Sequence, residues 1–215
     1  MGGNPGSFNK LPTLINKIHS LNMKFVPIID AGISYRPNQN YKAFDNGMKE
    51  DIFMKVNGEV FIGKVWPNEA AYPDFTHPNS TAWWGSELDT FHSKIAFDGI
   101  WQDMNEASNF CNGDCFKGQQ AASPVANKLM YTPTGEDIET KSISLDVKHY
   151  NNMTQLDAHS FFGASQVAAS NAWFTKNNKR TMVISRSSFA GMGKYGSAWL
   201  GDNHAAVDDM EISVL

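Results

Sequence analysis

The chain has 215 residues, a net charge of -4 and 41% hydrophobic residues. This composition is typical of a globular protein with enough apolar material for a sizeable core. It excludes the basic surface that nucleic-acid binding requires, and no run of about 18 apolar residues is present that could cross a membrane.

Helical and strand patterns alternate along the first half of the chain. Apolar residues at helical spacing predict a helix, and a short continuous apolar run predicts a strand buried on both faces of a parallel sheet. In chain order these patterns predict a helix over 8–21, a fully buried strand over 24–30, a turn-rich insertion over 31–80 with short strands at 52–56 and 59–65, a helix over 84–95 and a strand over 97–103.

A long polar segment, residues 104–150, separates the two halves and carries both cysteines. The alternation then resumes. The predicted elements are a helix over 156–174, a strand over 181–186, a short strand over 197–202 and a helix that begins near His204.

This alternation indicates an α/β fold built on a parallel sheet, either doubly wound or part of a (β/α)₈ TIM barrel. A doubly wound nucleotide-binding protein requires a Gly-rich turn after a strand, and no predicted strand is followed by one. A whole barrel takes about 250 residues before insertions, whereas four predicted strands occupy 215 residues here. We therefore expect one domain, residues 1–215, that forms about four of eight barrel strands with long insertions at 31–80 and 104–150.

Each predicted strand of the sheet ends in a charged residue. The four residues are Asp30, Asp103, Arg186 and Asp202. Ligands bind at the carboxyl ends of parallel strands in α/β folds, so three acids and one arginine would converge on a single cleft. Asp30 and Asp202 could instead cap a turn or a helix. Asp103 is harder to explain in this way, because Glu106 and Trp101 crowd the same strand exit.

Two facing carboxylates with an arginine and aromatic side chains around them suit glycoside hydrolysis. One carboxylate must be ionised to attack or stabilise the sugar carbon, and the other must hold a proton for the leaving oxygen. Retaining enzymes place the two carboxyl groups about 5–5.5 Å apart, and inverting enzymes about 6.5–9.5 Å apart. The residues alone therefore predict a reaction class without its stereochemistry.

Cys111, Cys115 and two sequons bear on the cellular compartment. The Gly-Asp turn between the cysteines could bring them together in a local disulfide, and the alternative is two free thiols in a reducing compartment. Two thiols cannot complete a structural zinc site, and we expect no metal. Asn79 and Asn152 each begin an Asn-x-Thr/Ser sequon, which favours the secretory pathway.

The segment Phe-Asp-Gly-Ile-Trp-Gln-Asp-Met-Asn-Glu, residues 97–106, resembles the active-site signature of glycoside hydrolase family 31. This family contains the α-glucosidases related to lysosomal acid α-glucosidase, sucrase-isomaltase and maltase-glucoamylase. Residues 186–191, followed by 199–203, resemble the second signature of the family. Intervening blocks also match, at 28–34, 63–67 and 72–76. The resemblance runs from about residue 8 to the C-terminus.

The resemblance implies a retaining, exo-acting α-glucosidase that hydrolyses terminal non-reducing α-glucosidic bonds of maltose-like oligosaccharides through a covalent glucosyl-aspartate. It implies that Asp103 is the nucleophile and Asp202 the general acid/base. The implied substrate-binding residues are Asp30, Trp66, Trp101, Met104, Arg186 and Trp199. It also implies a disulfide between Cys111 and Cys115, and no cofactor. For Trp101, a position in the core remains the alternative.

The exact activity stays open at this point. The alternatives are another family activity, such as α-xylosidase, glycan-processing glucosidase or transglucosylase, and an inactive truncated fragment. By comparison with the family, we expect the remaining barrel strands and the flanking β-domains in the full-length protein. The first residues do not form a signal peptide. The family and the sequons nevertheless favour the secretory pathway, with a lysosomal or extracellular destination, and the expected partner is an α-glucoside oligosaccharide.

Overall fold

The computed structural model of the chain describes residues 8–116 and 138–214. Its parallel sheet contains β6 (Ile100–Gln102), β7 (Val183–Ser185) and β8 (Ser197–Ala198), which are neighbours in chain order. Residues 25–29 extend the sheet on the other side of β6 through backbone hydrogen bonds of 2.8–2.9 Å. Consecutive parallel segments lying side by side are the order of a barrel, whereas a doubly wound sheet reverses its strand order at a switch point. The sheet does not close on itself within the described residues.

The first segment of this sheet is less buried than its apolar sequence predicts. Ile28 forms a parallel bridge to β6, yet 52% of its surface is exposed. Phe25 and Ile29 pack against the core from the same segment. The prediction of a fully buried strand over 24–30 is therefore wrong, because among the described residues this segment is the edge of the sheet.

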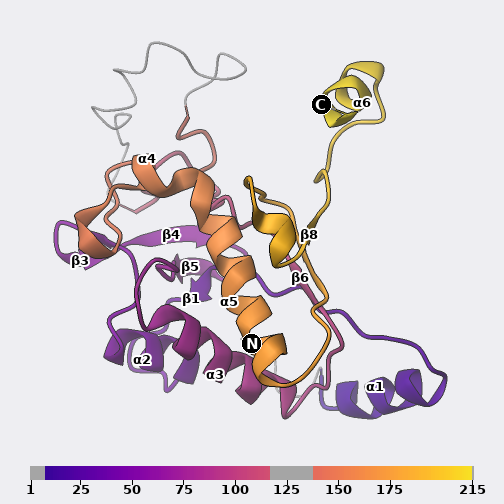
Figure 1. Ribbon diagram of the computed structural model, residues 1–215. Helices are drawn as coiled ribbons and strands as arrows, with labels where there is room; N and C mark the ends of the chain where they lie inside the picture. The colour runs from indigo at the N-terminus through magenta and orange to yellow at the C-terminus, as the bar shows by residue number, and fades with distance from the viewer. Residues whose placement is uncertain (1–7, 117–137, 215) are drawn as a thin grey trace.

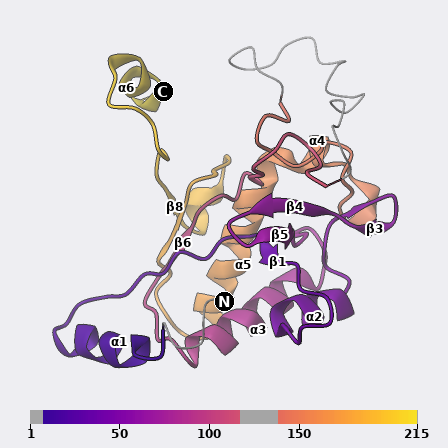
Figure 2. The same ribbon diagram turned by 180° about the vertical axis from the view of Figure 1, so that it is seen from behind.

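Helices α5 (Phe162–Lys176) and α3 (Ser80–His92) pack together against one face of the parallel sheet, whereas α1 (Leu11–Ser20) lies apart from them (Figure 1, Figure 2). The predicted helices are present as α1 (Leu11–Ser20), α3 (Ser80–His92) and α5 (Phe162–Lys176), the last preceded by α4 (Gln155–Ala158), with 3₁₀ turns at Tyr150–Asn152, His159–Phe161 and Met192–Lys194. Ser170 on α5 accepts hydrogen bonds from Trp84 Nε1 on α3 (2.8 Å) and from Gln102 Nε2 on β6 (2.6 Å). Two helices and the central strand thus meet at one buried hydroxyl.

The insertion after the first sheet segment folds into small antiparallel sheets. Its strands are β1 (Ile33–Ser34), β5 (Asn68–Ala71) and β4 (Ile62–Val65), in that spatial order, with a hairpin of β2 (Lys55–Val56) and β3 (Glu59–Val60). The sequence did not predict α2 (Lys42–Lys49). Gly47 weakens the helical pattern there, and a Cβ at this position would lie 2.5 Å from the Phe53 ring. Gly47 therefore allows the close packing of α2 on Phe53, and it is also the residue that makes this helix hard to predict from the sequence.

The C-terminal segment departs from the sheet sooner than predicted. β8 ends at Ala198, and α6 (Val207–Val214) begins after His204. Both views place α6 apart from the other helices, at the end of an extended segment (Figure 1, Figure 2). Leu200 and Met210 are 65% and 61% exposed. Within residues 8–116 and 138–214, no helix has the length and apolar character needed to cross a membrane.

Candidate active site

Two charged side chains leave the carboxyl ends of β6 and β7 and meet there. The Arg186 N–H donates to the Gln102 carbonyl (3.0 Å), which carries the parallel ladder one residue past β7. Nη1 of Arg186 then lies 2.9 Å from Oδ1 of Asp103. The two side chains are 24% and 22% exposed, so water screens this ion pair only in part.

Glu106 completes the contacts of this arginine. Its Oε1 accepts a hydrogen bond from Arg186 Nε (2.8 Å), and its Oε2 accepts one from Nη2 (3.0 Å). A bidentate pair of this kind fixes the plane of the guanidinium as well as its position. The hydrogen bonds from Arg186 to Glu106 raise the pKa of Arg186 above its ordinary value, although partial burial opposes the shift. Arg186 is therefore a fixed cation between two carboxylates.

The turn that follows Asp103 is held by the buried side chain of Asn105. Its Nδ2 donates to Ser185 Oγ (2.8 Å), and its Oδ1 accepts from the Ser187 N–H (3.1 Å). Gly163 on α5 packs directly against this turn, because a Cβ there would lie 2.6 Å from Ser187 Cβ and 2.8 Å from the Asn105 carbonyl oxygen. The core helix thus sets the position of the turn that carries the acids.

Asp30 belongs to the same electrostatic cluster. Burial, together with the negative charge of Asp103, raises the pKa of Asp30 to about 6, although Arg186 opposes the shift. Its Oδ1 is buried and has no hydrogen-bond partner among the described residues. A buried carboxyl oxygen without a partner is unfavourable unless a donor reaches it, and a sugar hydroxyl is a suitable donor.

Asp202 approaches the same arginine from the C-terminal segment. Its Oδ2 is 4.0 Å from Arg186 Nη1, and its side chain is 96% exposed. Gly201 has φ +81°, and a Cβ there would come within 3.2 Å of Arg186 Cδ. Asp202 does not cap the following helix, because α6 begins only at Val207. The structure therefore brings Asp103 and Asp202 to one guanidinium nitrogen.

The aromatic residues expected in the site fall into two groups. Trp101 and Trp199 contact each other edge to face, with ring centroids 5.4 Å apart. Trp66 is 75% exposed between β4 and β5, and its ring centroid lies 5.0 Å from that of Phe110. Trp101 is 37% exposed, so the alternative of a core position for this residue does not hold.

Met104 connects the turn after Asp103 to the insertion at residues 31–80. Its backbone has φ +57°, and its N–H donates to Asp103 Oδ1 (2.8 Å). Its side chain is 8% exposed and packs with Val65 and Ala70 from the antiparallel sheet. Met104 therefore lies beside Asp103, but its side chain packs into a small hydrophobic cluster with Val65 and Ala70.

Two further residues of this region, Glu106 and Phe110, have no role predicted from the sequence. Glu106 was noted only as a second acid near Asp103. Its partner Arg186 is 80 residues away along the chain, so no local pattern reveals the ion pair. The available signal was its place as the last residue of the segment 97–106.

The cysteines and sequons lie outside the acid cluster. Cys111 and Cys115 form a disulfide with their Cα atoms 5.6 Å apart, so the alternative of two free thiols is wrong. Asn79 and Asn152 are both exposed, which is a condition for glycosylation. Their modification stays a prediction.

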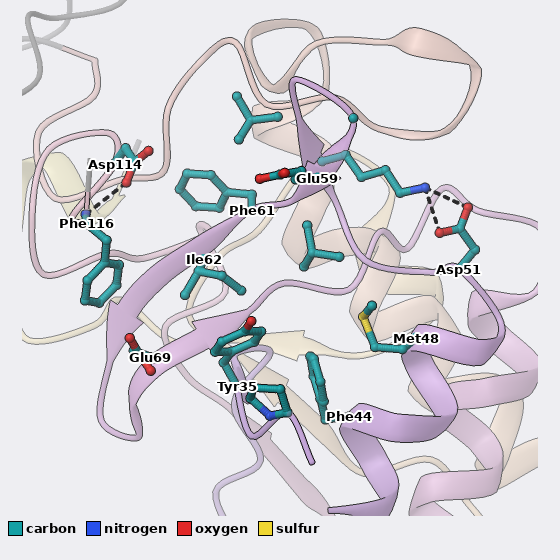
Figure 3. Close-up of a pocket in the computed structure, with 15 residues that line it drawn as sticks. Tyr35, Phe44, Met48, Asp51, Glu59, Phe61, Ile62, Glu69, Asp114 and Phe116 are labelled. Atoms are coloured by element: carbon teal, nitrogen blue, oxygen red, sulfur yellow. Dashed lines mark hydrogen bonds and ion pairs between the residues drawn. The ribbon is translucent and has the colours of Figure 1, made fainter. Parts of the chain in front are cut away.

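A cavity of about 730 Å³ lies in the insertion rather than at the acids (Figure 3). Tyr35 and Phe44 line one side of it, and Phe61 and Ile62 line another. None of the charged residues at the ends of β6, β7 and β8 lines this cavity. The candidate active site is therefore defined by the converging acids and their arginine.

The sequence of the chain matches a known domain over almost its whole length. Residues 3–215 match the model of the glycosyl hydrolases family 31 TIM-barrel domain. The chain belongs to glycosyl hydrolase family 31. The predicted α/β fold with part of a (β/α)₈ barrel is therefore confirmed.

Two curated members of family 31 illustrate the range of similar proteins. The chain is 34% identical to α-xylosidase 1 of Arabidopsis thaliana over 229 residues, which cover 95% of this chain and 25% of that protein. It is 35% identical to an α-glucosidase of Hordeum vulgare over 207 residues, which cover 95% of this chain and 23% of that protein. The chain thus spans about a quarter of the length of these relatives.

The fold agrees with a solved structure of the family. The glucosidase II α subunit, in its DNJ-bound form, superposes with a TM-score of 0.72 and 27% sequence identity. The match covers 92% of this chain and 19% of that chain.

Proposed function

We propose that these residues carry the catalytic pair of a retaining, exo-acting α-glucosidase that acts on the terminal non-reducing α-glucosidic bonds of maltose-like oligosaccharides. The observation that carries the proposal is the approach of Asp103 and Asp202 to the same nitrogen of Arg186, at 2.9 and 4.0 Å. Two carboxyl groups that both reach one nitrogen can adopt the separation of about 5–5.5 Å used by retaining enzymes.

The proposed reaction has two steps. An oxygen of Asp103 forms a bond to the anomeric carbon while the bond from that carbon to the leaving oxygen breaks, and Asp202 gives its proton to the leaving oxygen. In the second step water attacks the same carbon, Asp202 takes a proton from the water, and the glucosyl ester bond to Asp103 breaks. The product is α-glucose, with the configuration of the substrate retained.

The other assigned residues would bind the terminal glucose. Asp30 and Arg186 would bind its hydroxyl groups, because Asp30 Oδ1 has no hydrogen-bond partner among the described residues and Arg186 lies beside Asp103. Trp66, Trp101, Met104 and Trp199 would line the pocket, the indole rings covering the apolar face of the sugar. The position of Met104, whose side chain is 8% exposed, supports a role in fixing the Asp103 turn more than direct contact.

An α-xylosidase is the second candidate, because α-xylosidase 1 is as similar to this chain as the α-glucosidase is. Xylose lacks the hydroxymethyl group of glucose. The full-length protein should be assayed with p-nitrophenyl α-glucoside and p-nitrophenyl α-xyloside. A kcat/KM that favours the glucoside supports the first candidate, and a preference for the xyloside replaces it with the second.

Covalent labelling tests the nucleophile assignment directly. A fluoroglucosyl inactivator should modify the full-length protein at one residue, and peptide mass spectrometry should locate the adduct on Asp103. An adduct on another carboxylate, or turnover of the inactivator by a variant that lacks the Asp103 carboxylate, would refute the assignment.

The proposal extends to the cellular setting and to the rest of the barrel. A disulfide and exposed sequons support passage through the secretory pathway, toward a lysosomal or extracellular site. Residues 1–215 would form one part of a catalytic barrel domain, with insertions at 31–80 and 104–150, and the remaining strands and β-domains would belong to the full-length protein.

A further inference from the structure

The two carboxylate oxygens of Asp103 have unequal surroundings. Oδ1 accepts the Met104 N–H at 2.8 Å and lies 2.9 Å from Arg186 Nη1. Among the described residues, no donor reaches Oδ2. A hydrogen bond withdraws electron density from the oxygen that accepts it, so Oδ2 is the better placed oxygen to form a bond to carbon.

This inequality depends on which edge of the guanidinium faces Asp103. A guanidinium presents two forks of parallel N–H bonds, one from Nε and Nη2 and one from Nη1 and Nη2. Each fork matches both oxygens of a carboxylate, and such forks are the preferred arginine–carboxylate geometry. In the structure, the edge with Nε and Nη2 is taken up by Glu106, at 2.8 and 3.0 Å. Asp103 meets the other edge of the guanidinium, where Nη1 lies 2.9 Å from its Oδ1.

We propose that Glu106 is a positioning residue that holds the Nε/Nη2 edge of Arg186 and fixes the plane of the guanidinium, so that only Nη1 contacts Asp103 and Oδ2 stays free to attack the sugar. Without Glu106, the guanidinium turns and forms its fork with Asp103, which engages both oxygens of the nucleophile. The inference rests on the proposed function of Asp103, and it adds a reason why a third acid lies beside the catalytic pair.

Contacts on both sides hold this arrangement. The buried Asn105 fixes the turn through Ser185 and Ser187, and this sets Glu106 opposite Arg186. On the far side, a Cβ on Gly201 would lie 3.2 Å from Arg186 Cδ, so the arginine stem has little room to shift toward the C-terminal segment. The guanidinium plane could still rotate, and the two hydrogen bonds to Glu106 prevent this rotation.

The first test measures the step in which Asp103 attacks. In the full-length protein, Glu106→Gln keeps the size of the side chain but loses the charge and one acceptor. We expect the rate of inactivation by a fluoroglucosyl reagent, and kcat for p-nitrophenyl α-glucoside, to fall about 10- to 100-fold, with a smaller change in KM. A loss confined to KM, or no loss, would contradict the inference.

A double-mutant cycle separates positioning from a general structural role. Arg186→Lys replaces the fork with a single ammonium, which cannot pair with both oxygens of Asp103 in the same geometry. In this background Glu106→Gln should change the inactivation rate less than about 3-fold, because the group that Glu106 restrains is gone. An equal loss in both backgrounds would show that Glu106 acts independently of Arg186, and the inference would fail.

A control variant and a crystal structure separate the test of Glu106 from the test of the proposed function. Glu59→Gln, at an exposed acid on β3, should leave kcat within about 2-fold. A crystal structure of the Glu106→Ala protein gives a readout without turnover: both Asp103 oxygens should lie within hydrogen-bond distance of Arg186. Retention of a single contact would refute the inference. A wild-type protein without turnover of any α-glycoside would refute the proposed function, and the crystal structure would still decide the positioning.

Discussion

The insertion and the C-terminal segment both lead to the acid cluster, yet they are built in opposite ways. In the insertion, buried Asp74 pairs with His149 Nδ1 at 2.9 Å, and Gln155 Oε1 accepts from Nε2 of the same ring at 2.7 Å. In the C-terminal segment, the side chain of Asp202 is 96% exposed, and its Oδ2 lies 4.0 Å from Arg186 Nη1.

The described residues can therefore hold one half of the site by themselves, and leave the other half without support. Internal hydrogen bonds and packing hold Asp103, the proposed nucleophile, whereas few contacts hold Asp202, the proposed acid/base. The two halves should therefore respond differently to substitution, and the following experiments test that contrast.

The largest expected contrast in activity is between variants of the two proposed catalytic acids. Asp103→Asn should lower kcat by at least about 10⁴-fold for every substrate, because no covalent bond can form. Asp202→Asn should lower kcat about 10²- to 10⁴-fold for maltose, but much less for a glucoside whose leaving group needs no proton. Steady-state kinetics on maltose and p-nitrophenyl α-glucoside measure both.

A structural acid near the opposite end of β6, Asp98, is the control. Asp98 accepts hydrogen bonds from the Phe25 N–H (2.9 Å) and pairs with His19 (2.8 Å), so it connects α1 to the sheet edge. Asp98→Asn should lower thermal stability while leaving kcat nearly unchanged. Equal losses for Asp202→Asn on both substrates would end its assignment as the acid.

The buried pair of the insertion predicts the next largest effect. Asp74→Asn leaves His149 without its charged partner, and the expected loss is about 3 kcal/mol of unfolding free energy, measured by urea denaturation. The exposed Asp51, paired with Lys55, supplies the matched control, since Asp51→Asn should cost less than about 0.5 kcal/mol. Equal costs would remove the contrast between buried and exposed ion pairs.

The same pair makes stability depend on acid pH. Burial alone would raise the pKa of Asp74, but hydrogen bonds from His149, Thr76 and the Tyr150 N–H outweigh it and lower the pKa below its usual range. A lowered carboxyl pKa stabilises the folded state above about pH 4, and this contribution is lost as the pH falls below that value. The decline in unfolding free energy below pH 4 should be shallower in Asp74→Asn.

Removal of the disulfide should cause a smaller loss of stability. Cys111 and Cys115 are four positions apart, and closing so short a loop contributes roughly 2 kcal/mol in the chain-entropy account. Cys111→Ser with Cys115→Ser should lower the Tm by several degrees, and a reducing agent should do so only in the wild type. A reducing agent that lowers the Tm of the double variant equally would show that this disulfide is not responsible.

The C-terminal segment predicts the smallest effect. Met210 is 61% exposed, so Met210→Ala should change the unfolding free energy by less than about 0.5 kcal/mol. Phe61, which is 1% exposed in the insertion, is the counterpart, and Phe61→Ala should cost about 3–5 kcal/mol. A large loss of unfolding free energy for Met210→Ala in the full-length protein would show that other parts of the protein cover this segment.

Local patterns predicted the parts of the fold that depend on local physics. Helical spacing identified α3 and α5, and the charged residues at strand ends identified Asp103 and Arg186, whose ion pair the structure contains. Parallel strands place their carboxyl ends together, so this part of the site follows from chain order. The disulfide was expected from the family resemblance and is present.

What the sequence missed depends on contacts between distant residues. The exposure of Ile28 reflects the position of its strand at the sheet edge, and α2 owes its place to the contact of Gly47 with Phe53. The ion pair of Glu106 with Arg186 joins residues 80 positions apart. None of these is encoded in the periodicity of a single segment.

The charge balance around Arg186 has a consequence for ligands. One guanidinium serves the carboxyl groups of Asp103, Glu106 and Asp202, and Asp30 adds another that ionises near pH 6. The local potential is therefore negative, and it attracts cations. Protonated amines shaped like a sugar should be held more tightly as the pH rises through 6 and Asp30 loses its proton, and more weakly as ionic strength increases.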